Sequence, residues 1–138
     1  MFLLDTNVVS ELRKVASGKA DDKVELWANA TPALRTFIST ITIFELERGI
    51  CLVERKDNQQ GHILRNWLEN NVFNHYRDRI ISVDTNIARR CAVIQVPDPL
   101  SPYDAFIAAT ALEHNLVVVT RNVSDFEQTG VRLLNPWE

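Results

Sequence analysis

The sequence is poor in the residues that cross-link or ligate metals in small proteins. It has two cysteines and three histidines among 138 residues. Cys51 and Cys91 stand alone without C-x-x-C spacing, which argues against a disulfide framework and predicts two buried thiols in a reducing compartment. His62, His75 and His114 share no metal-ligand spacing either, so the sequence argues against a zinc site.

Excess charge and long apolar runs are also lacking. The formal net charge is −3, so the chain is not the strongly basic domain typical of bulk nucleic-acid binding. The 15 Lys and Arg residues nevertheless remain available for local contacts if several acids gather at one site. No stretch approaches the ~18 apolar residues of a membrane span, and no basic leader opens the sequence. We expect one domain over residues 1–138 in a soluble, cytoplasmic protein.

Short apolar runs alternate with helical patterns along the chain. This alternation predicts right-handed βαβ crossovers and a three-layer α/β/α domain around a central parallel sheet of about five strands. The predicted strands are 2–5, 36–39, 79–83, 116–120 and 131–134. The predicted helices begin near residue 7 and cover 21–30, 42–55, 58–72, 85–95, 102–114 and 124–128.

Acidic residues stand where apolar runs stop and helical patterns begin: Asp5, Glu45, Asp104 and Asp125. In an open parallel sheet, ligands collect outside the carboxyl ends of the strands, so the fold would bring these residues together. Clustered carboxylates repel each other unless protons or a cation neutralise them. The sequence therefore predicts a site for a hard divalent metal such as Mg²⁺.

Helix capping is the alternative explanation for three of these acids. Thr42-x-x-Glu45 fits a capping box, Ser101 and Pro102 place Asp104 in a first helical turn, and Ser124-x-x-Glu127 repeats the box beside Asp125. Asp5 resists this explanation, because it ends a buried strand where an unpartnered charge is costly. Asp84, which follows the third strand, suits a purely structural N-cap.

Four spaced blocks of the sequence carry a family resemblance: Leu3-Leu4-Asp5-Thr6-Asn7, Ser39 to Leu46, Asp104 to Ala111 and Val118 to Phe126. Together they resemble the PIN-domain ribonucleases, and more narrowly the VapC-type toxins of type II toxin–antitoxin modules. The ending Asn135-Pro136-Trp137 is similar to that of the FitB branch. The resemblance implies sheet order 3-2-1-4-5, Mg²⁺ or Mn²⁺, RNA cleavage and a cognate antitoxin.

The resemblance also assigns roles to individual residues. Asp5 and Asp104 match the main metal ligands and Glu45 the third acid, whereas the fourth position falls to Asn122 or Asp125. The implied reaction is metal-assisted phosphodiester hydrolysis, which leaves a 5′-phosphate and a 3′-hydroxyl. The residues expected to contact substrate are Thr6, Asn7, Thr120 and Arg121, with Arg13, Lys14 and Arg48 as further basic candidates.

Partners follow from the same resemblance. The chain is expected to cleave tRNA or another structured RNA, to form a homodimer, to be neutralised by a VapB-like antitoxin, and to reach operator DNA through that antitoxin. The helices at 42–56 and 58–74 carry Phe44, Trp67 and Phe73, which suit either a dimer interface, an antitoxin groove or core packing.

Other functions make different demands on the sequence. A haloacid-dehalogenase-like phosphatase needs a second Asp where this chain has Asn7. A phosphoacceptor receiver module needs a lysine after its last strand, and no lysine follows Lys56. A noncatalytic PIN-like interaction module, or another Mg²⁺-dependent phosphohydrolase, stays open.

Overall fold

A parallel five-stranded sheet forms the centre of the fold. The computed structural model describes residues 1–138, and its strand order β3-β2-β1-β4-β5 confirms the predicted order. β1 occupies the middle, where Leu3 pairs with Phe37 of β2 and with Val118 of β4. The strands are β1 Phe2–Leu4, β2 Thr36–Ser39, β3 Ile80–Ile81, β4 Val117–Val119 and β5 Leu133–Leu134.

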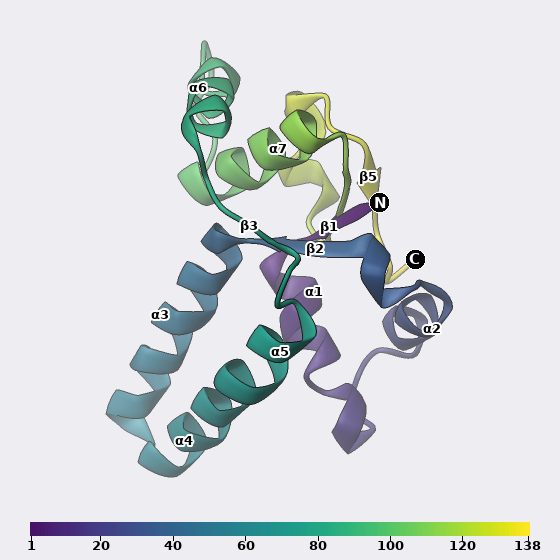
Figure 1. Cartoon of the computed structure of the whole chain (residues 1–138), viewed down its shortest axis with the longest axis vertical. Coiled ribbons are helices and arrows are strands. Elements are labelled where there is room, and N and C mark those ends of the chain that lie inside the picture. The colour runs from purple at the N-terminus through teal and green to yellow at the C-terminus, as the bar shows by residue number, and fades with distance from the viewer.

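Helices cover both faces of this sheet (Figure 1). α1, α3, α4 and α5 lie on one side, and α6 and α7 lie on the other. None of the helices combines the length and the apolar character needed to cross a membrane. The helices are α1 Thr6–Leu12, α2 Asp22–Ala30, α3 Thr40–Lys56, α4 Asn58–Trp67, α5 Phe73–His75, α6 Thr85–Ile94 and α7 Pro102–His114, with a π-helical turn at Leu68–Val72.

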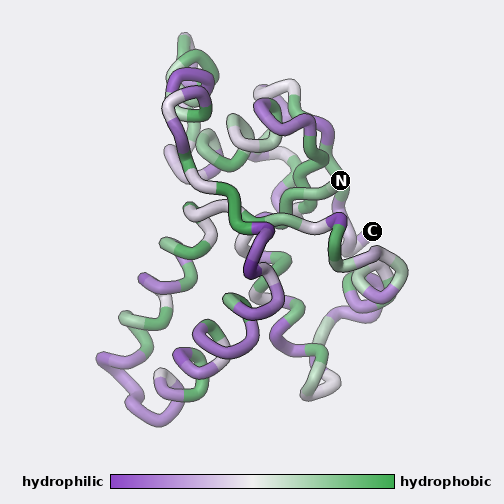
Figure 2. The backbone as a smooth tube through the Cα atoms, viewed as in Figure 1, coloured by the Kyte–Doolittle hydropathy of each residue, from purple (hydrophilic) through white to green (hydrophobic).

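The two faces of the sheet bury separate hydrophobic clusters. Successive strand residues point to opposite faces, so Leu4 joins a cluster with α1 and α3, while Leu3 joins one with α7. Phe126 and Ile107 are fully buried in the second cluster. Because both faces of the strands are covered, the strands read as continuous apolar runs, and Figure 2 shows hydrophobic residues along them.

The third helix begins earlier than its sequence pattern predicts. α3 starts at Thr40, and Ser39 caps it by accepting a hydrogen bond from the Ile41 amide. Thr42 is the third residue of the helix and not its N-cap, so the predicted Thr42–Glu45 capping box is wrong. The pattern misled because serine and threonine both suit an N-cap, and it is the end of β2 at Ser39 that fixes where the helix starts.

Three smaller expectations also fail. Ser101 precedes α7 but its side chain makes no capping hydrogen bond. The segment after β4 forms two short 3₁₀ turns, Val123–Asp125 and Glu127–Thr129, and neither has a side-chain cap. Cys91 is buried as predicted, whereas Cys51 is exposed on α3.

α3 and α4 form a hairpin that extends away from the sheet (Figure 1). The Arg65 guanidinium of α4 bridges the two helices by pairing with the carboxylates of Glu47 and Glu54 on α3. The helices also approach closely at Gly61, where an added Cβ would lie 2.8 Å from the Cα atom of Glu54. A residue without a side chain is therefore required at this crossing.

Substitution of the two helical glycines with alanine should change stability in opposite directions. Gly61→Ala should lower the free energy of unfolding by about 1–3 kcal/mol, because the new methyl group meets backbone that cannot move aside easily. Gly49→Ala is the matched control: it adds a methyl group in open space within α3 and should raise stability by about 0.5–1 kcal/mol. Urea denaturation measures both, and a destabilised Gly49→Ala or a neutral Gly61→Ala would contradict the packing described.

Candidate active site

Asp5, at the carboxyl end of the central strand, is the only charged residue among the buried residues of the protein. Its side chain caps α1, since the Thr6 amide donates to Asp5 Oδ1 at 2.8 Å. On the other side, the Thr120 hydroxyl at the end of β4 donates to Asp5 Oδ2 at 2.8 Å. Asp5 is 5% exposed and has no basic partner among the ion pairs. These hydrogen bonds fix its orientation without neutralising its charge.

Glu45 lies beside Asp5 and is held by the neighbouring Thr6. The Thr6 hydroxyl donates to Glu45 Oε1 at 2.7 Å, and Thr6 Oγ1 lies 3.1 Å from Thr42 Oγ1. Glu45 stands in the second turn of α3, where it would not be needed for capping because Ser39 serves that purpose. The structure thus joins the acids of β1 and α3 through one threonine.

Asp104 and Asp125 complete a loose acidic cluster. Burial, followed by the charges of Asp5, Asp125 and Glu45, raises the pKa of Asp104 to about 6. Repulsion of this kind requires the four carboxyl groups to lie near one another. Asp104 stands in the first turn of α7, directly before the fully buried Ala105, so the packing of α7 on the sheet sets its position.

The pKa of Asp5 is raised for similar reasons. Burial makes the largest contribution, hydrogen bonds from Thr120 and the Thr6 amide oppose it, and the charges of Glu45 and Asp125 add to it. Two carboxyl groups of the cluster are therefore more basic than ordinary aspartates. Both would be stabilised in their ionised form by a nearby cation.

The acidic cluster fits a divalent cation chemically, although its side chains are spread. No three His, Cys, Asp or Glu side chains already stand in an arrangement that would hold a metal ion. Carboxylate oxygens are nonetheless the ligands preferred by Mg²⁺, and no basic side chain pairs with the cluster. A hard cation would relieve the repulsion that raises the two pKa values.

Polar residues around Asp5 form a connected network. Asn7 Nδ2 lies 3.3 Å from Asp5 Oδ2, and Asn7 Oδ1 accepts the Arg121 amide at 3.3 Å. Thr120 Oγ1 accepts the Asn122 amide at 3.0 Å while donating to Asp5. The loop after β4 is thereby attached to the first turn of α1.

Asn122 and Asp125, the two candidates for the fourth position, differ in how they interact with the other residues of the site. Asn122 contributes its backbone amide to Thr120, and its side chain makes no hydrogen bond in the site. The charge of Asp125 acts on both Asp5 and Asp104. Among the basic candidates, Arg121 adjoins this network through its backbone, whereas Arg48 stacks on Phe44 and Tyr103.

Sequence reasoning missed two residues around the acids. The sequence suggests a helix cap for Thr42, but its side chain lies buried against Thr6. Its position three residues before Glu45 places both side chains on one face of the helix, and this spacing was the available signal. The Trp137 ring lies under the Arg121 guanidinium, with the Arg121 Cζ atom 5.3 Å from the ring centroid. No local pattern connects these two residues, because they follow different strands.

Asp84 lies outside the acidic cluster, as predicted. Its carboxylate accepts the Ile87 amide at 2.9 Å and caps α6. It contributes to neither raised pKa. Asp84 therefore provides a structural aspartate with which the cluster residues can be compared.

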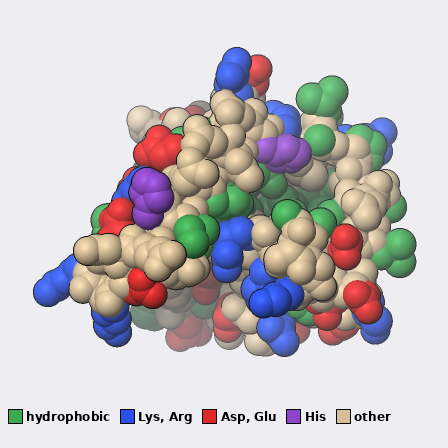
Figure 3. Space-filling model, turned by 90° about the horizontal axis from the view of Figure 1, so that it is seen from below, with side chains coloured by type: hydrophobic (Ala, Val, Ile, Leu, Met, Phe, Trp, Pro, Cys, Tyr) green, Lys and Arg blue, Asp and Glu red, His purple; other side chains and the backbone are tan.

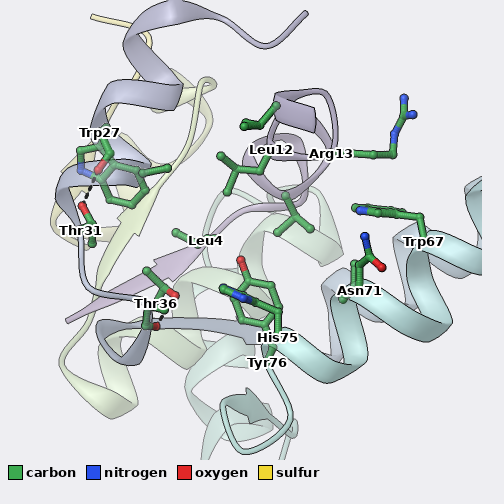
Figure 4. A pocket seen from close by; sticks show the side chains of 15 residues that line it. Leu4, Leu12, Arg13, Trp27, Thr31, Thr36, Trp67, Asn71, His75 and Tyr76 are labelled. Atoms are coloured by element: carbon green, nitrogen blue, oxygen red, sulfur yellow. Dashed lines mark hydrogen bonds between the residues drawn. The ribbon is translucent and has the colours of Figure 1, made fainter. Parts of the chain in front are cut away.

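An apolar groove lies on the side of the sheet that carries α1, α2 and α4. It has a volume of about 370 Å³, and most of its lining residues are hydrophobic. Trp27 of α2, Leu12 of α1 and Trp67 of α4 face this space, with His75 and Tyr76 nearby (Figure 4). Figure 3 shows this side of the molecule hollowed near its centre, with hydrophobic side chains in the hollow and Lys or Arg side chains beside it.

Proteins of similar sequence match this chain over nearly their whole length. VapC ribonuclease Y4jK of Sinorhizobium fredii is 34% identical over 100% of this chain and 99% of its own. Toxin FitB of Neisseria gonorrhoeae is 30% identical over 99% of both chains.

Solved complexes show the same fold. The crystal structure of FitAcB from Neisseria gonorrhoeae superposes with a TM-score of 0.90 at 30% identity, covering 100% of this chain and 99% of that one. FitAB bound to an IR36 DNA fragment gives 0.88 at 28% identity, covering 100% and 96%. A toxin-antitoxin complex from Klebsiella pneumoniae gives 0.66 at 29% identity, covering 100% and 99%.

The family model described as PIN domain matches residues 2–131, which include all four acids of the cluster. The fold, the sheet order and the placement of Asp5 at the end of the central strand agree with this match. The chain belongs to the PIN domain family.

Proposed function

We propose that the chain is the toxin of a type II toxin–antitoxin pair and that it hydrolyses RNA phosphodiester bonds with Mg²⁺, or Mn²⁺ in its place. The observation that carries this proposal is the convergence of Asp5, Glu45, Asp104 and Asp125 at the carboxyl end of the sheet. The ribonuclease and toxin relatives support the reaction and the biological role. Residues 1–138 act as one catalytic domain in the cytoplasm.

Asp5 and Asp104 would hold the metal ion. Glu45 would be either a third ligand or the group that orients the attacking water by accepting a hydrogen bond from it. When bound, the cation supplies charge stabilisation at the scissile phosphate and activates water for hydrolysis. Thr120 and the Thr6 amide keep Asp5 oriented, and the Thr6 hydroxyl does the same for Glu45. The products are a 5′-phosphate and a 3′-hydroxyl, because the RNA 2′-hydroxyl takes no part.

The surrounding polar groups would position the substrate. Thr6 and Asn7 begin α1 and Arg121 follows β4, so phosphate contacts would come from the start of α1 and from the loop after β4. Thr120 is fully buried and donates its hydroxyl to Asp5, so it would orient the carboxylate rather than contact the phosphate. Asp125 fits the fourth catalytic position better than Asn122, because its charge reaches Asp5 and Asp104. The substrate would be tRNA or another structured RNA with an accessible strand.

The cognate antitoxin would occupy the apolar groove beside α1, α2 and α4. Trp67 and Trp27 offer large surfaces of the kind that anchor an amphipathic helix. Similarity to FitAB bound to DNA and to a toxin-antitoxin complex supports a partner that carries the operator contacts. In this proposal the toxin forms a homodimer within the assembly, through the exposed Phe44 and its neighbours.

Replacement of the metal-binding acids should abolish cleavage without unfolding the protein. Asp5→Asn and Asp104→Asn should each lower the cleavage rate by at least about 100-fold, equivalent to roughly 3 kcal/mol of lost transition-state stabilisation. Asp84→Asn is the matched control and should cleave like the wild type, because asparagine caps a helix as well as aspartate. End-mapping of the RNA products measures cleavage, and full activity of Asp5→Asn would refute the mechanism.

This comparison also separates catalysis from the noncatalytic alternative. A PIN-like interaction module would bind RNA or a partner without producing new 5′-phosphate ends at any Mg²⁺ concentration. A ribonuclease produces them only when the metal and the acids are both present. Titration of the wild type with Mg²⁺ therefore decides between the two functions.

Protons and metal should compete for the acidic cluster. The ordinary pKa of Asp104 is 3.8 and its folded value is about 6, so between these pH values the folded chain binds more protons than the unfolded chain. Stability of the metal-free protein should consequently fall as the pH rises from about 4 to 6. Thermal unfolding should show this fall in the wild type and a weaker one in Asp104→Asn.

Addition of Mg²⁺ provides the second arm of the same measurement. Because the cation binds ionised carboxylates, it should raise the melting temperature more at pH 7 than at pH 5. Asp104→Asn should lose most of this rise. Equal Mg²⁺ effects at the two pH values would show that the cluster does not bind the ion.

Truncation inside the groove should weaken the antitoxin complex and spare the nuclease. Trp67→Ala removes an aromatic anchor and should lower antitoxin affinity by at least about 10-fold, or roughly 2 kcal/mol. Ile63→Ala is the control, since Ile63 is exposed on the same helix but does not line the groove. Titration calorimetry with the antitoxin encoded beside the toxin measures both variants, and RNA cleavage verifies their folding. Unchanged affinity of Trp67→Ala would place the antitoxin elsewhere.

A further inference from the structure

The Arg121 side chain rests on the aromatic ring of Trp137 at the edge of the acidic cluster. The Arg121 Cζ atom lies 5.3 Å from the ring centroid, within the range of a cation–π interaction. Arg121 directly follows Thr120, whose hydroxyl binds Asp5. The last residues of the chain therefore reach back to a basic side chain near the central carboxylate.

Trp137 provides a fixed support for this contact. Its amide donates to Asn135 Oδ1 at 2.9 Å, which closes a tight turn after β5. Its ring is half-buried against the hydrophobic cluster that contains Leu4 and Val119. The backbone turn and the packing against this cluster both hold the ring. The ring therefore keeps its position when the Arg121 side chain moves.

The backbone of Arg121 is fixed as well, while its charge stays available. Its amide donates to Asn7 Oδ1 at 3.3 Å, and Asn7 Nδ2 lies 3.3 Å from Asp5 Oδ2. Arg121 is exposed and takes part in no salt bridge. A guanidinium with five donors and no protein anion is suited to bind a phosphate.

We infer that Trp137 is a positioning residue that holds the Arg121 guanidinium in place for a phosphate of the RNA beside the scissile bond. This inference rests on the proposed ribonuclease function for the identity of the ligand. A long arginine side chain loses conformational freedom when it binds, and an aromatic support reduces this loss beforehand. Trp137 acts through Arg121 and does not touch the reacting atoms.

A double-mutant cycle tests whether the two residues act as a unit. The variants are Trp137→Leu, Trp137→Phe, Arg121→Gln and the double variant Trp137→Leu with Arg121→Gln. The probe is a single-stranded RNA oligonucleotide in buffer without divalent ions, so that binding is measured by fluorescence anisotropy without cleavage. Leucine retains apolar packing but lacks a ring, whereas phenylalanine retains a ring. Trp137→Phe is therefore the matched control for Trp137→Leu.

Trp137→Leu should weaken RNA binding by about 2- to 5-fold, and Trp137→Phe should stay close to the wild type. Arg121→Gln should lower the slope of log affinity against log salt by about 0.7, the value for one phosphate contact with a single strand. In the Arg121→Gln background, Trp137→Leu should have no further effect. In cleavage assays the Trp137→Leu defect should appear in KM and leave kcat nearly unchanged.

Several outcomes would overturn the inference. Additive effects in the cycle would show that Trp137 acts independently of Arg121. Equal defects in the leucine and phenylalanine variants would assign the effect to packing, which melting temperatures would also report. If the wild type did not bind RNA, an RNA phosphate could not be the ligand of Arg121. RNA binding with intact coupling but no cleavage would refute the ribonuclease proposal, and of this inference it would leave only the support that Trp137 gives Arg121 for an RNA phosphate.

Discussion

The buried charge of Asp5 is the constraint on which the rest of the site depends. A carboxylate that is almost fully enclosed at the end of the central strand cannot remain ionised at low cost without donors or a cation. Thr120, the Thr6 amide and Asn7 supply donors, yet all three are neutral. Because no basic side chain completes the charge balance, the site is left with an affinity for a positive ion. This charge imbalance is the physical basis of the metal-dependent reaction proposed for the site.

The parallel sheet makes this arrangement possible with few residues. Asp5 caps α1 and Asp104 lies in the first turn of α7, where the positive end of each helix dipole offsets part of the charge. Glu45 lies in the second turn of α3, and Asp125 lies in a short 3₁₀ turn after β4. Thr6 connects Asp5 to Glu45, and the loop after β4 is attached through Thr120 and Asn7. A single layer of short-range hydrogen bonds therefore joins segments that lie more than a hundred residues apart.

The topology and the principal acids could be predicted from the sequence, because apolar runs and helical patterns alternate clearly. The order of the strands followed from the family resemblance, and it places Asp5 at the centre. Local patterns were less informative about caps: Ser39 and Thr42 both suit an N-cap and both are fully buried, and the end of β2 at Ser39 decides which of them caps α3. Side-chain contacts between distant loops, such as Trp137 with Arg121, have no signature in local sequence.

The α3–α4 hairpin and the acidic edge of the sheet differ in how strongly salt can act on their polar contacts. Partly exposed ion pairs of Arg65 with Glu47 and Glu54 join the two helices, and dissolved salt screens such pairs. The hydrogen bond from Thr120 to Asp5 is buried, so salt screens it much less. Ionic strength therefore acts unequally along the chain: it weakens the bridge between α3 and α4, while close packing at Gly61 and the buried contact of Asp5 keep their strength.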